Sequence, residues 1–316
     1  MRILIAGAGA LGSVFGGFLR RAGDEVALLG RAAHLDAVAR DGLRIDGLWG
    51  EHVVRGFTVA TEPAALRGPF NVILLPVKSY DTAAVAAAVA PLLASDGVMI
   101  SVQNGLGNVE TVEAAVGAER ALGARVIFGA TLPAPGHVRV TVFADPTAIG
   151  ALAPGRYARR DALVRELAAR IDAAGVPAVA TDHLPAMLWA KVFYNAALNP
   201  LGALLDLHYG ALPEHPESRD LMDAVIDEAF AVATAEGLSF KWPSAAAYRD
   251  EFYGRLVPST YHHRSSMLQD LERGRRTEID AINGAVWQRG RARGVAAPVN
   301  AALTRLLRVV EARRAA

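Results

Sequence analysis

The chain has 316 residues, no cysteine, and 33 Lys and Arg against 32 Asp and Glu. Its length corresponds to about two domains of roughly 150 residues, and the absence of thiols excludes disulfides, cysteine nucleophiles, cysteine-ligated zinc and iron–sulfur clusters. The balanced charge argues against a nucleic-acid partner, and no apolar run reaches the roughly 18 to 20 residues that span a bilayer. Because residues 1–7 read as a first strand without a signal-peptide pattern, we expect a globular, cytoplasmic protein.

In the first part of the chain, short apolar runs alternate with helical stretches, which is typical of a parallel sheet covered by helices. The predicted strands are Arg2–Ala6, Glu25–Leu29, Val72–Pro76, Val98–Val102 and Arg120–Ile127. Their nearly continuous hydrophobicity suits strands that are buried on both faces.

Beyond about Thr181, apolar residues recur at helical spacing, which predicts an all-helical second domain. The boundary is placed near residue 180, after a helix over Asp161–Ala174 and a short strand over Val176–Ala180, giving domains 1–180 and 181–316. The helices predicted in the second domain are Leu184–Leu205, Ser218–Glu236, Thr277–Arg293 and an amphipathic surface helix over Leu303–Arg314.

A glycine-rich turn, Gly7-Ala8-Gly9-Ala10-Leu11-Gly12, follows the first strand and precedes a helical run over Ser13–Ala22. In a dinucleotide-binding turn, the first glycine makes the bend, the second admits the pyrophosphate and the third lets helix and strand pack closely. The placement favours dinucleotide binding over a merely structural turn.

The end of the second strand distinguishes the two nicotinamide cofactors. An acid about 20 residues past the glycines would accept hydrogen bonds from a ribose 2′-OH, but this window contains Gly30-Arg31. A guanidinium is a bidentate partner for a 2′-phosphate. Arg31 therefore favours NADPH, the alternative being an ordinary exposed arginine at a strand end.

Two polar loops follow the third and fourth predicted strands, where parallel sheets bind ligands. Lys78 could neutralise cofactor phosphate, and Asn104 could fix the nicotinamide or the substrate through its amide. The alternatives are a solvated lysine and a turn asparagine before glycine.

Lys191, Asn195 and Asn199 are spaced by four, so a helix places them in one polar stripe among apolar neighbours. A solvated face usually mixes Glu and Lys rather than two asparagines, so a stripe facing a cleft is the better interpretation. An ammonium beside a substrate carbonyl can stabilise the developing negative charge and donate a proton, which makes Lys191 a candidate general acid.

A second polar cluster contains Ser266 and Glu278. Ser266 with Gln269, and Thr277 with Asp280, have capping-box spacing, so each pair can instead start a helix. Glu278 would lie in a first helical turn, able to pair with Lys191 or accept a hydroxyl, or would be a surface acid that complements the helix dipole. The pair His262-His263 lacks companions at ligand spacing, so no metal site is expected.

Five segments in order over nearly the whole chain resemble the ketopantoate reductase (2-dehydropantoate 2-reductase) family. They are the Gly7–Gly12 turn, residues 78–82, residues 103–107, the helix with Lys191, Asn195 and Asn199-Pro200, and residues 265–270 with 277–284. The resemblance implies a Rossmann domain followed by a helical domain like that of 6-phosphogluconate dehydrogenase. It also implies NADPH-dependent reduction of a 2-keto acid, the pantoate step of coenzyme A synthesis, in a cleft between the domains.

The resemblance assigns roles residue by residue. Lys191 is the proton donor, Asn195, Asn199 and Ser266 hold the substrate, and Asn104 touches substrate and cofactor. The cofactor contacts implied are the Gly7–Gly12 turn, Arg31, Lys78, Ala130 and Glu278, with Glu278 also counted among the catalytic residues. The resemblance also allows a homodimer formed through the helical domains.

Two positions depart from the pattern of pantoate-forming members. Tyr209-Gly210 stands where Asn-Gly is common, and His263 stands where Asn is frequent. Both belong to the substrate side, so a reductase of another small keto acid or ketone is an alternative. From a different class, a non-catalytic NADPH-sensing module is also an alternative, although a sensor needs no acid in the cleft.

Overall fold

The computed structural model describes residues 1–315 and divides into two compact units. Unit 1 comprises Met1–Asn104 and Asn108–Leu184, and unit 2 comprises Gly105–Gly107 and the chain from Pro185 onwards. The boundary drawn from the sequence near residue 180 precedes Leu184 by four residues (184 − 180).

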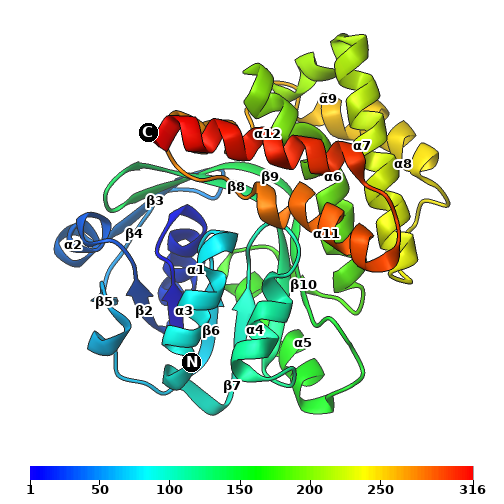
Figure 1. The fold of residues 1–316 in the computed structure, drawn as a ribbon. Helices are drawn as coiled ribbons and strands as arrows, with labels where there is room; N and C mark the ends of the chain where they lie inside the picture. Colours follow the sequence, from blue (N-terminus) through cyan, green and yellow to red (C-terminus); the bar gives the residue numbers. More distant parts are fainter. Residues whose placement is uncertain (316) are drawn as a thin grey trace. The chain divides into compact units, whose positions relative to one another are not determined.

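Unit 1 is built on a ten-stranded sheet with the order β4-β3-β9-β8-β7-β6-β1-β2-β5, and β10 pairs with β9 (Figure 1). The strands are β1 (Arg2–Ala6), β2 (Glu25–Leu29), β3 (Leu43–Gly47), β4 (His52–Val54), β5 (Thr58–Ala60), β6 (Phe70–Leu75), β7 (Leu93–Ser101), β8 (Ala121–Ala134), β9 (His137–Gly150) and β10 (Ala178–Ala180). All strands predicted from the sequence lie in this sheet, and β1 and β2 have the predicted bounds.

The sheet is mixed rather than wholly parallel. From β8 through β7, β6, β1 and β2 to β5, every pair is parallel, as predicted. The strand predicted over Arg120–Ile127 instead continues to Ala134, turns at Pro135-Gly136 and returns as β9, antiparallel to β8. Gly136 has a φ of 72° in this turn, a conformation that glycine adopts without steric cost. The predicted parallel sheet is therefore confirmed for the strands from β8 to β5, and the antiparallel pairs β8–β9 and β3–β4 are additions that the sequence did not predict.

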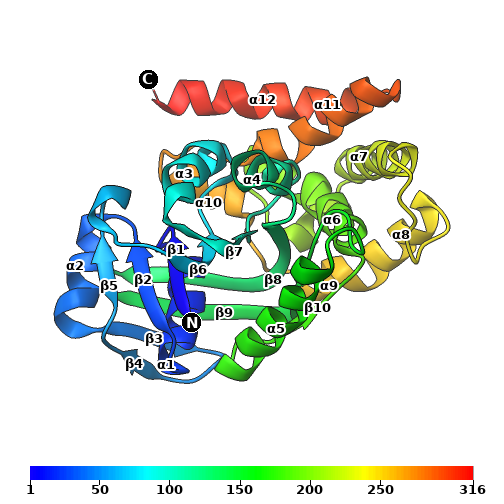
Figure 2. The same cartoon turned by 90° about the horizontal axis from the view of Figure 1, so that it is seen from below.

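Helices cover both faces of the sheet (Figure 2). Successive side chains of β1 point to opposite faces, so Ile3 and Ile5 join one core and Leu4 joins the other. Phe15 is buried in the first core and Val112 in the second. The helices of this unit are α1 (Ala10–Arg21), α2 (Ala32–Asp41), α3 (Thr82–Val89), α4 (Asn108–Val116) and α5 (Ala158–Ala174). This is a Rossmann-type domain, and it explains why the predicted strands are apolar on both sides.

A buried carboxylate links β3 to its parallel neighbour β9. Asp46 on β3 accepts hydrogen bonds from Arg139 Nε at 2.8 Å and Nη2 at 2.9 Å, and lies 2.8 Å from Nε2 of His137. The guanidinium of Arg139 and the ring of His137 hold the pKa of Asp46 well below its usual range.

Asp46 should therefore make the free energy of unfolding decrease as the pH falls into the acid range. Because the pKa of Asp46 is lowered in the native state, its ionised carboxylate stabilises the fold fully above the ordinary Asp pKa of about 4. This stabilisation is lost as the pH falls toward the native pKa. We expect Asp46→Asn to lower the urea midpoint at pH 7, and the difference from the unaltered protein to shrink by pH 3. Glu25→Gln, which breaks only the exposed pair with Arg2, is the control and should change little. An equal difference at both pH values would contradict the ionic role.

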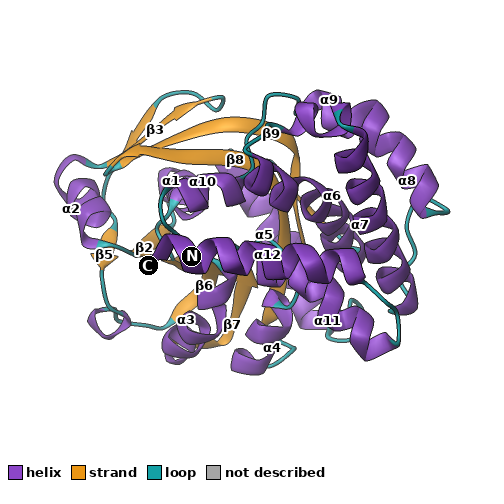
Figure 3. Cartoon of the chain, turned by 45° about the horizontal axis from the view of Figure 1, so that its top comes forward, coloured by secondary structure: helices purple, strands orange, loops and turns teal. Residues whose placement is uncertain are grey.

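Unit 2 contains only helices, turns and loops among the residues described (Figure 3). Its helices are α6 (Leu184–Leu205), η4 (Tyr209–Glu214), α7 (Pro216–Ala235), α8 (Ala245–Glu251), η5 (Phe252–Leu256), α9 (Val257–Ser259), α10 (Ser266–Glu272), η6 (Ile279–Ala281), α11 (Asn283–Arg293) and α12 (Pro298–Ala315). Across residues 1–315, no helix has both the length and the apolar character needed to cross a membrane.

The helix expected over Thr277–Arg293 is interrupted. A 3₁₀ turn, η6, occupies Ile279–Ala281, and α11 begins only at Asn283, because Ile282 between them has φ −104° and ψ −92°, outside the helical region. The prediction of α6 is confirmed at both ends.

Asn283 compensates for a proline inside α6. Pro200 has no N–H, so the carbonyl of Ala196 loses its helical partner. Nδ2 of Asn283 donates to that carbonyl at 3.0 Å and to Oδ1 of Asn300, also at 3.0 Å. Asn283 is fully buried, so water cannot replace these bonds.

We expect Asn283→Ala to lower the free energy of unfolding by about 1–3 kcal/mol, because it leaves a buried carbonyl without a donor. Chemical denaturation measures the change. Gln288→Ala, at an exposed position on the same helix, is the matched control and should stay within about 0.5 kcal/mol. Equal effects of the two substitutions would show that the bond to α6 contributes nothing.

Candidate functional site

In the glycine turn after β1, protein atoms pack closely around Gly7 and Gly12 but leave free space beside Gly9. Gly7 has a φ of 133°, and a Cβ there would lie 2.7 Å from Val77 Cγ1. A Cβ on Gly12 would lie 2.2 Å from the carbonyl oxygen of Gly7, so no larger residue fits. A Cβ on Gly9 would meet nothing within 4 Å. Packing within the protein therefore does not explain Gly9, whereas the approach of a ligand does.

The start of α1 adds hydrogen-bond donors to this turn. Gly9 is the N-cap residue, and no side chain caps the helix or places an acid in its first turn. The first N–H groups of an uncapped helix carry positive potential and bind anions. The turn and α1 thus form an open cradle with the geometry and polarity that suit an anion, which leaves the predicted pyrophosphate contact as a prediction.

Arg31 lies beside the same turn. A Cβ on Gly30 would be 3.0 Å from the Cβ of Ala8, so the chain leaving β2 runs against the glycine turn. Arg31 is exposed at the N-cap of α2, and its guanidinium makes no hydrogen bond or ion pair with any residue between 1 and 315. Burial and, to a smaller extent, the charge of Arg31 lower the pKa of His34. A positive charge therefore stands next to the cradle.

A buried network joins the loops that carry Lys78 and Asn104. Nε2 of Gln103 donates to Oγ1 of Thr82, and Oγ1 of Thr82 lies 2.9 Å from Oδ1 of Asn108. Nδ2 of Asn108 donates to the carbonyl of Asn104 at 2.9 Å. The roles of Thr82, Gln103 and Asn108 were not predicted from the sequence, although polar residues directly after two buried strands were a usable signal.

Lys78 and Asn104 are half-buried at the carboxyl ends of β6 and β7. Val77, next to Lys78, touches the glycine turn, so Lys78, Arg31 and the cradle share one edge of the sheet. Ala130 lies on β8, half-buried and paired with Val140 of β9.

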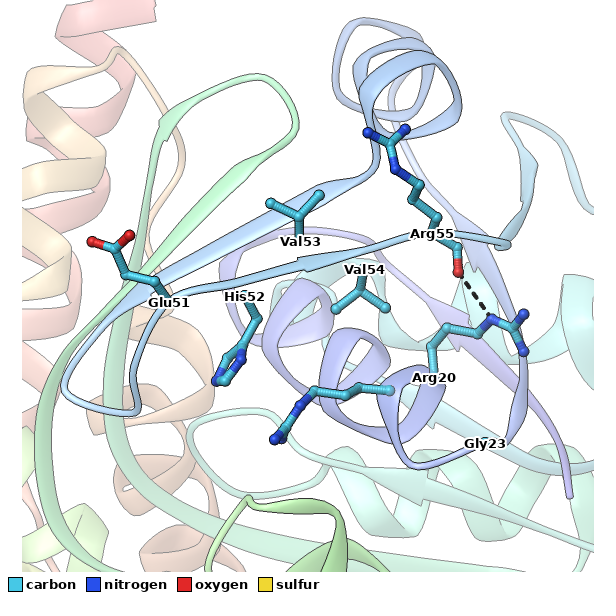
Figure 4. Close-up of a pocket in the computed structure, with 8 residues that line it drawn as sticks. Arg20, Gly23, Glu51, His52, Val53, Val54 and Arg55 are labelled. Atoms are coloured by element: carbon cyan, nitrogen blue, oxygen red, sulfur yellow. Dashed lines mark hydrogen bonds between the residues drawn. The ribbon is translucent and has the colours of Figure 1, made fainter.

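A separate hollow of about 570 Å³ lies at the other end of α1 (Figure 4). It is lined by Arg20, Arg21, Gly23, Glu51, His52, Val53, Val54 and Arg55. Nε of Arg20 donates to the carbonyl of Arg55 at 3.1 Å across it. Because the 12 residues of α1 span about 18 Å, this hollow is distinct from the glycine turn.

In unit 2, α6 carries the polar stripe predicted from the sequence. Lys191 is half-buried, and Asn195 and Asn199 are only 8% and 2% exposed. The alternative of a solvated helix face is therefore wrong. The side-chain amide of Asn195 makes no hydrogen bond within the described chain, which is costly unless water or a ligand completes it.

The start of α10 packs against the end of α6. A Cβ on Gly202 would lie 3.6 Å from Oγ of Ser265. Ser265, not Ser266, caps α10, since its Oγ accepts a hydrogen bond from the N–H of Leu268 at 3.0 Å. The alternative role of Ser266 as a cap is therefore wrong, and its half-buried hydroxyl has no hydrogen-bond partner in residues 1–315.

Glu278 is buried directly before η6. This position rules out the alternative of a surface acid. Its neighbour Thr277 does not form the expected capping box with Asp280, because its N–H and hydroxyl both bind Oε1 of Glu311. Since Asn283 binds the carbonyl of Ala196, the η6–α11 junction lies against α6 between the two asparagines of the stripe.

Side chains that could act as metal ligands do not gather in threes anywhere in the described chain. The polar groups that the structure places at the predicted positions are a lysine, amides, hydroxyls and a buried carboxylate in unit 2, and the anion cradle in unit 1.

Two family models match the sequence and together cover most of it. The model described as Ketopantoate reductase PanE/ApbA matches residues 3–154, and the one described as Ketopantoate reductase PanE/ApbA C terminal matches residues 183–311.

Full-length relatives agree with these models. The 2-dehydropantoate 2-reductase of Aquifex aeolicus is 37% identical over 315 residues, which cover 98% of this chain and 97% of the relative. The crystal structure of a PanE/ApbA family ketopantoate reductase from Ralstonia eutropha JMP134 is similar with a TM-score of 0.87 and 35% identity, over 99% of each chain. A ternary structure of D-mandelate dehydrogenase with NADH and anilino(oxo)acetate gives a TM-score of 0.87 at 26% identity, again over 99% of each chain.

Proposed function

Because the chain belongs to the ketopantoate reductase family, we propose that it reduces a 2-keto acid to the 2-hydroxy acid with NADPH, with 2-dehydropantoate as the first candidate substrate. The observation that carries this proposal is the stripe on α6, where a half-buried lysine shares one helix face with two buried asparagines. An acid and two amides held in this way suit a carbonyl substrate with a carboxylate, and a nucleotide sensor has no use for them.

Unit 1 binds the cofactor in this proposal. The pyrophosphate lies at the open Gly9 position and the start of α1, and Arg31 and Lys78 neutralise the phosphates. Asn104, Ala130 and Glu278 contact the cofactor as well. The resident residues fit a dinucleotide, since Gly9 leaves room that the protein does not fill. When bound, NADPH supplies the hydride that reduces C2 of the keto acid.

Unit 2 binds the substrate and supplies the proton. Asn195, Asn199 and Ser266 hold its carboxylate and hydroxyl by hydrogen bonds. The ammonium of Lys191 stabilises the negative charge that develops on the C2 oxygen and then transfers a proton to it, leaving a neutral amine that solvent reprotonates.

A different 2-keto acid is the second candidate substrate. The similar D-mandelate dehydrogenase structure contains anilino(oxo)acetate, an aromatic ligand. In this chain Tyr194, Tyr209 and His263 form an aromatic cluster, with ring centroids 5.7 and 5.0 Å apart. These rings favour a substrate with a larger apolar side chain.

The test follows NADPH absorbance with 2-dehydropantoate, short aliphatic 2-keto acids and a phenyl-substituted 2-keto acid. Oxidation that is fastest with 2-dehydropantoate supports the first candidate, and a preference for the aromatic acid supports the second. No oxidation with any of them, despite measurable NADPH binding, would overturn the enzyme proposal in favour of a non-catalytic nucleotide-binding protein.

A further inference from the structure

One hydrogen bond within unit 2 determines what Asn199 can offer to a ligand. The hydroxyl of Tyr209, at the start of η4, donates to Oδ1 of Asn199. Both side chains are almost completely buried, Tyr209 being 3% and Asn199 2% exposed. The bond occupies the acceptor end of the amide, so the NH₂ end faces the other way.

The NH₂ group of Asn199 remains available. Nδ2 has no hydrogen-bond partner among residues 1–315. It is also not completely shielded from solvent, since it is absent from the fully buried, unbonded polar atoms of the described residues. Asn195, one turn earlier, is 8% exposed, and its side-chain amide makes no hydrogen bond within residues 1–315 either. The stripe therefore presents at least one fixed N–H donor that an incoming ligand can use.

Tyr209 is held rigidly enough to act as a fixed donor. Its N–H binds the carbonyl of His263 at 3.0 Å, and its ring packs against those of His263 and Tyr194. The ring of Tyr261 packs directly on the next residue, Gly210, where a Cβ would collide with it. Burial raises the pKa of Tyr209 well above its usual value, so the phenol keeps its proton at any working pH.

We propose that Tyr209 is a positioning residue that locks the Asn199 amide as a hydrogen-bond donor and thereby selects substrates with an acceptor oxygen, such as a carboxylate, at that point. The proposal rests on the proposed function, because it assumes that Asn199 contacts the keto acid. Without the phenol, the amide rotates freely and presents its oxygen part of the time, which repels a carboxylate.

The experiment uses Tyr209→Phe, which keeps the ring and its packing but removes the hydroxyl. We expect KM for the 2-keto acid to rise about 10-fold, the value of one buried hydrogen bond, with kcat changed less than about threefold and NADPH affinity unchanged. The preference for the keto acid over its uncharged 2-keto amide should fall by a similar factor. Tyr253→Phe is the matched control, because its hydroxyl donates to Oδ1 of Asp223 at 2.7 Å and lies outside the aromatic cluster of Tyr194, Tyr209 and His263.

A double-mutant cycle separates positioning from general structure. In an Asn199→Ala background, Tyr209→Phe should have no further effect on KM, because the ring is kept and the amide through which the hydroxyl acts is gone. The same penalty in both backgrounds, or an equal effect of Tyr253→Phe, would overturn the role of Tyr209. If the unaltered chain turns over no 2-keto acid, the proposed function fails and this inference falls with it. Normal turnover with unchanged KM in Tyr209→Phe overturns the inference alone.

Discussion

Replacing Lys191 with alanine is expected to lower kcat by roughly 10²- to 10⁴-fold, the usual contribution of a positioned general acid. Without the ammonium, the charge on the C2 oxygen is not neutralised as the hydride arrives, and no group delivers the proton. Steady-state NADPH oxidation with the preferred 2-keto acid measures the effect. NADPH affinity, measured by fluorescence titration, should be unchanged, since the proposed phosphate contacts lie in unit 1.

Two controls sharpen this prediction. Lys191→Met keeps most of the stem and should lose as much activity as alanine, which would exclude a packing effect. Lys241→Ala removes an exposed lysine that binds Glu251 on the same unit and should leave kcat unchanged. Turnover at the level of the unaltered protein in both Lys191 variants is the result that would remove the acid from the mechanism.

The use of lysine at position 191 is itself informative. The sequence contains three lysines among 33 basic residues, so arginine supplies nearly all its positive charge. Arginine cannot give up a proton near neutral pH, whereas lysine can when its environment favours the neutral amine. A lysine on the buried stripe of α6 therefore fits proton transfer better than simple charge pairing.

The first half of the fold could be predicted because its signals are local. The apolar run of β1, the three glycines and the start of α1 follow each other within about 20 residues, and each needs only its neighbours to be recognised. The ends of β1 and β2 were correct for this reason. Helix α6 could also be predicted, because its 22 residues have a nearly continuous helical pattern and only one proline, Pro200, near the end.

Strands β3 and β9 were missed because their pairing is non-local. Arg44 pairs with His137, more than 90 residues later in the chain, and no short window shows this contact. A weaker signal was present, because His137, Val138, Arg139 and Val140 alternate polar and apolar residues, as in a strand with one exposed face. Because we expected strands to be apolar throughout, we did not interpret this alternating pattern as a strand.

In the candidate site, too, local patterns could be predicted from the sequence and contacts between distant segments could not. Spacing alone placed Lys191, Asn195 and Asn199 on one face of a helix, and the structure adds their burial. Capping-box spacing favoured Ser266, which has Gln269 three residues later, and it could not show that Ser265, which is followed by Leu268 at that distance, caps α10. Nor could it show that Tyr209 reaches Asn199, since that contact depends on how η4 packs against α6.

Arg31→Ala is expected to weaken NADPH binding by about 10- to 100-fold and NADH binding by less than about twofold. One or two charge-assisted hydrogen bonds to a phosphate, at an exposed position, contribute about 1.5 to 3 kcal/mol, which corresponds to that range. NADH carries no 2′-phosphate, so it does not use these bonds. Fluorescence titration with both cofactors at fixed ionic strength measures the selectivity.

The charge and the shape of the guanidinium can be separated with Arg31→Lys. A lysine keeps the positive charge but cannot bind two phosphate oxygens in a fork, so NADPH affinity should lie between those of the arginine and the alanine proteins. Raising the salt concentration should reduce the difference between arginine and alanine, because the contact is exposed and is screened. Equal losses for NADPH and NADH in Arg31→Ala would show that Arg31 stabilises the turn beside Gly30 rather than the 2′-phosphate, and cofactor choice would then have to be sought at Lys78.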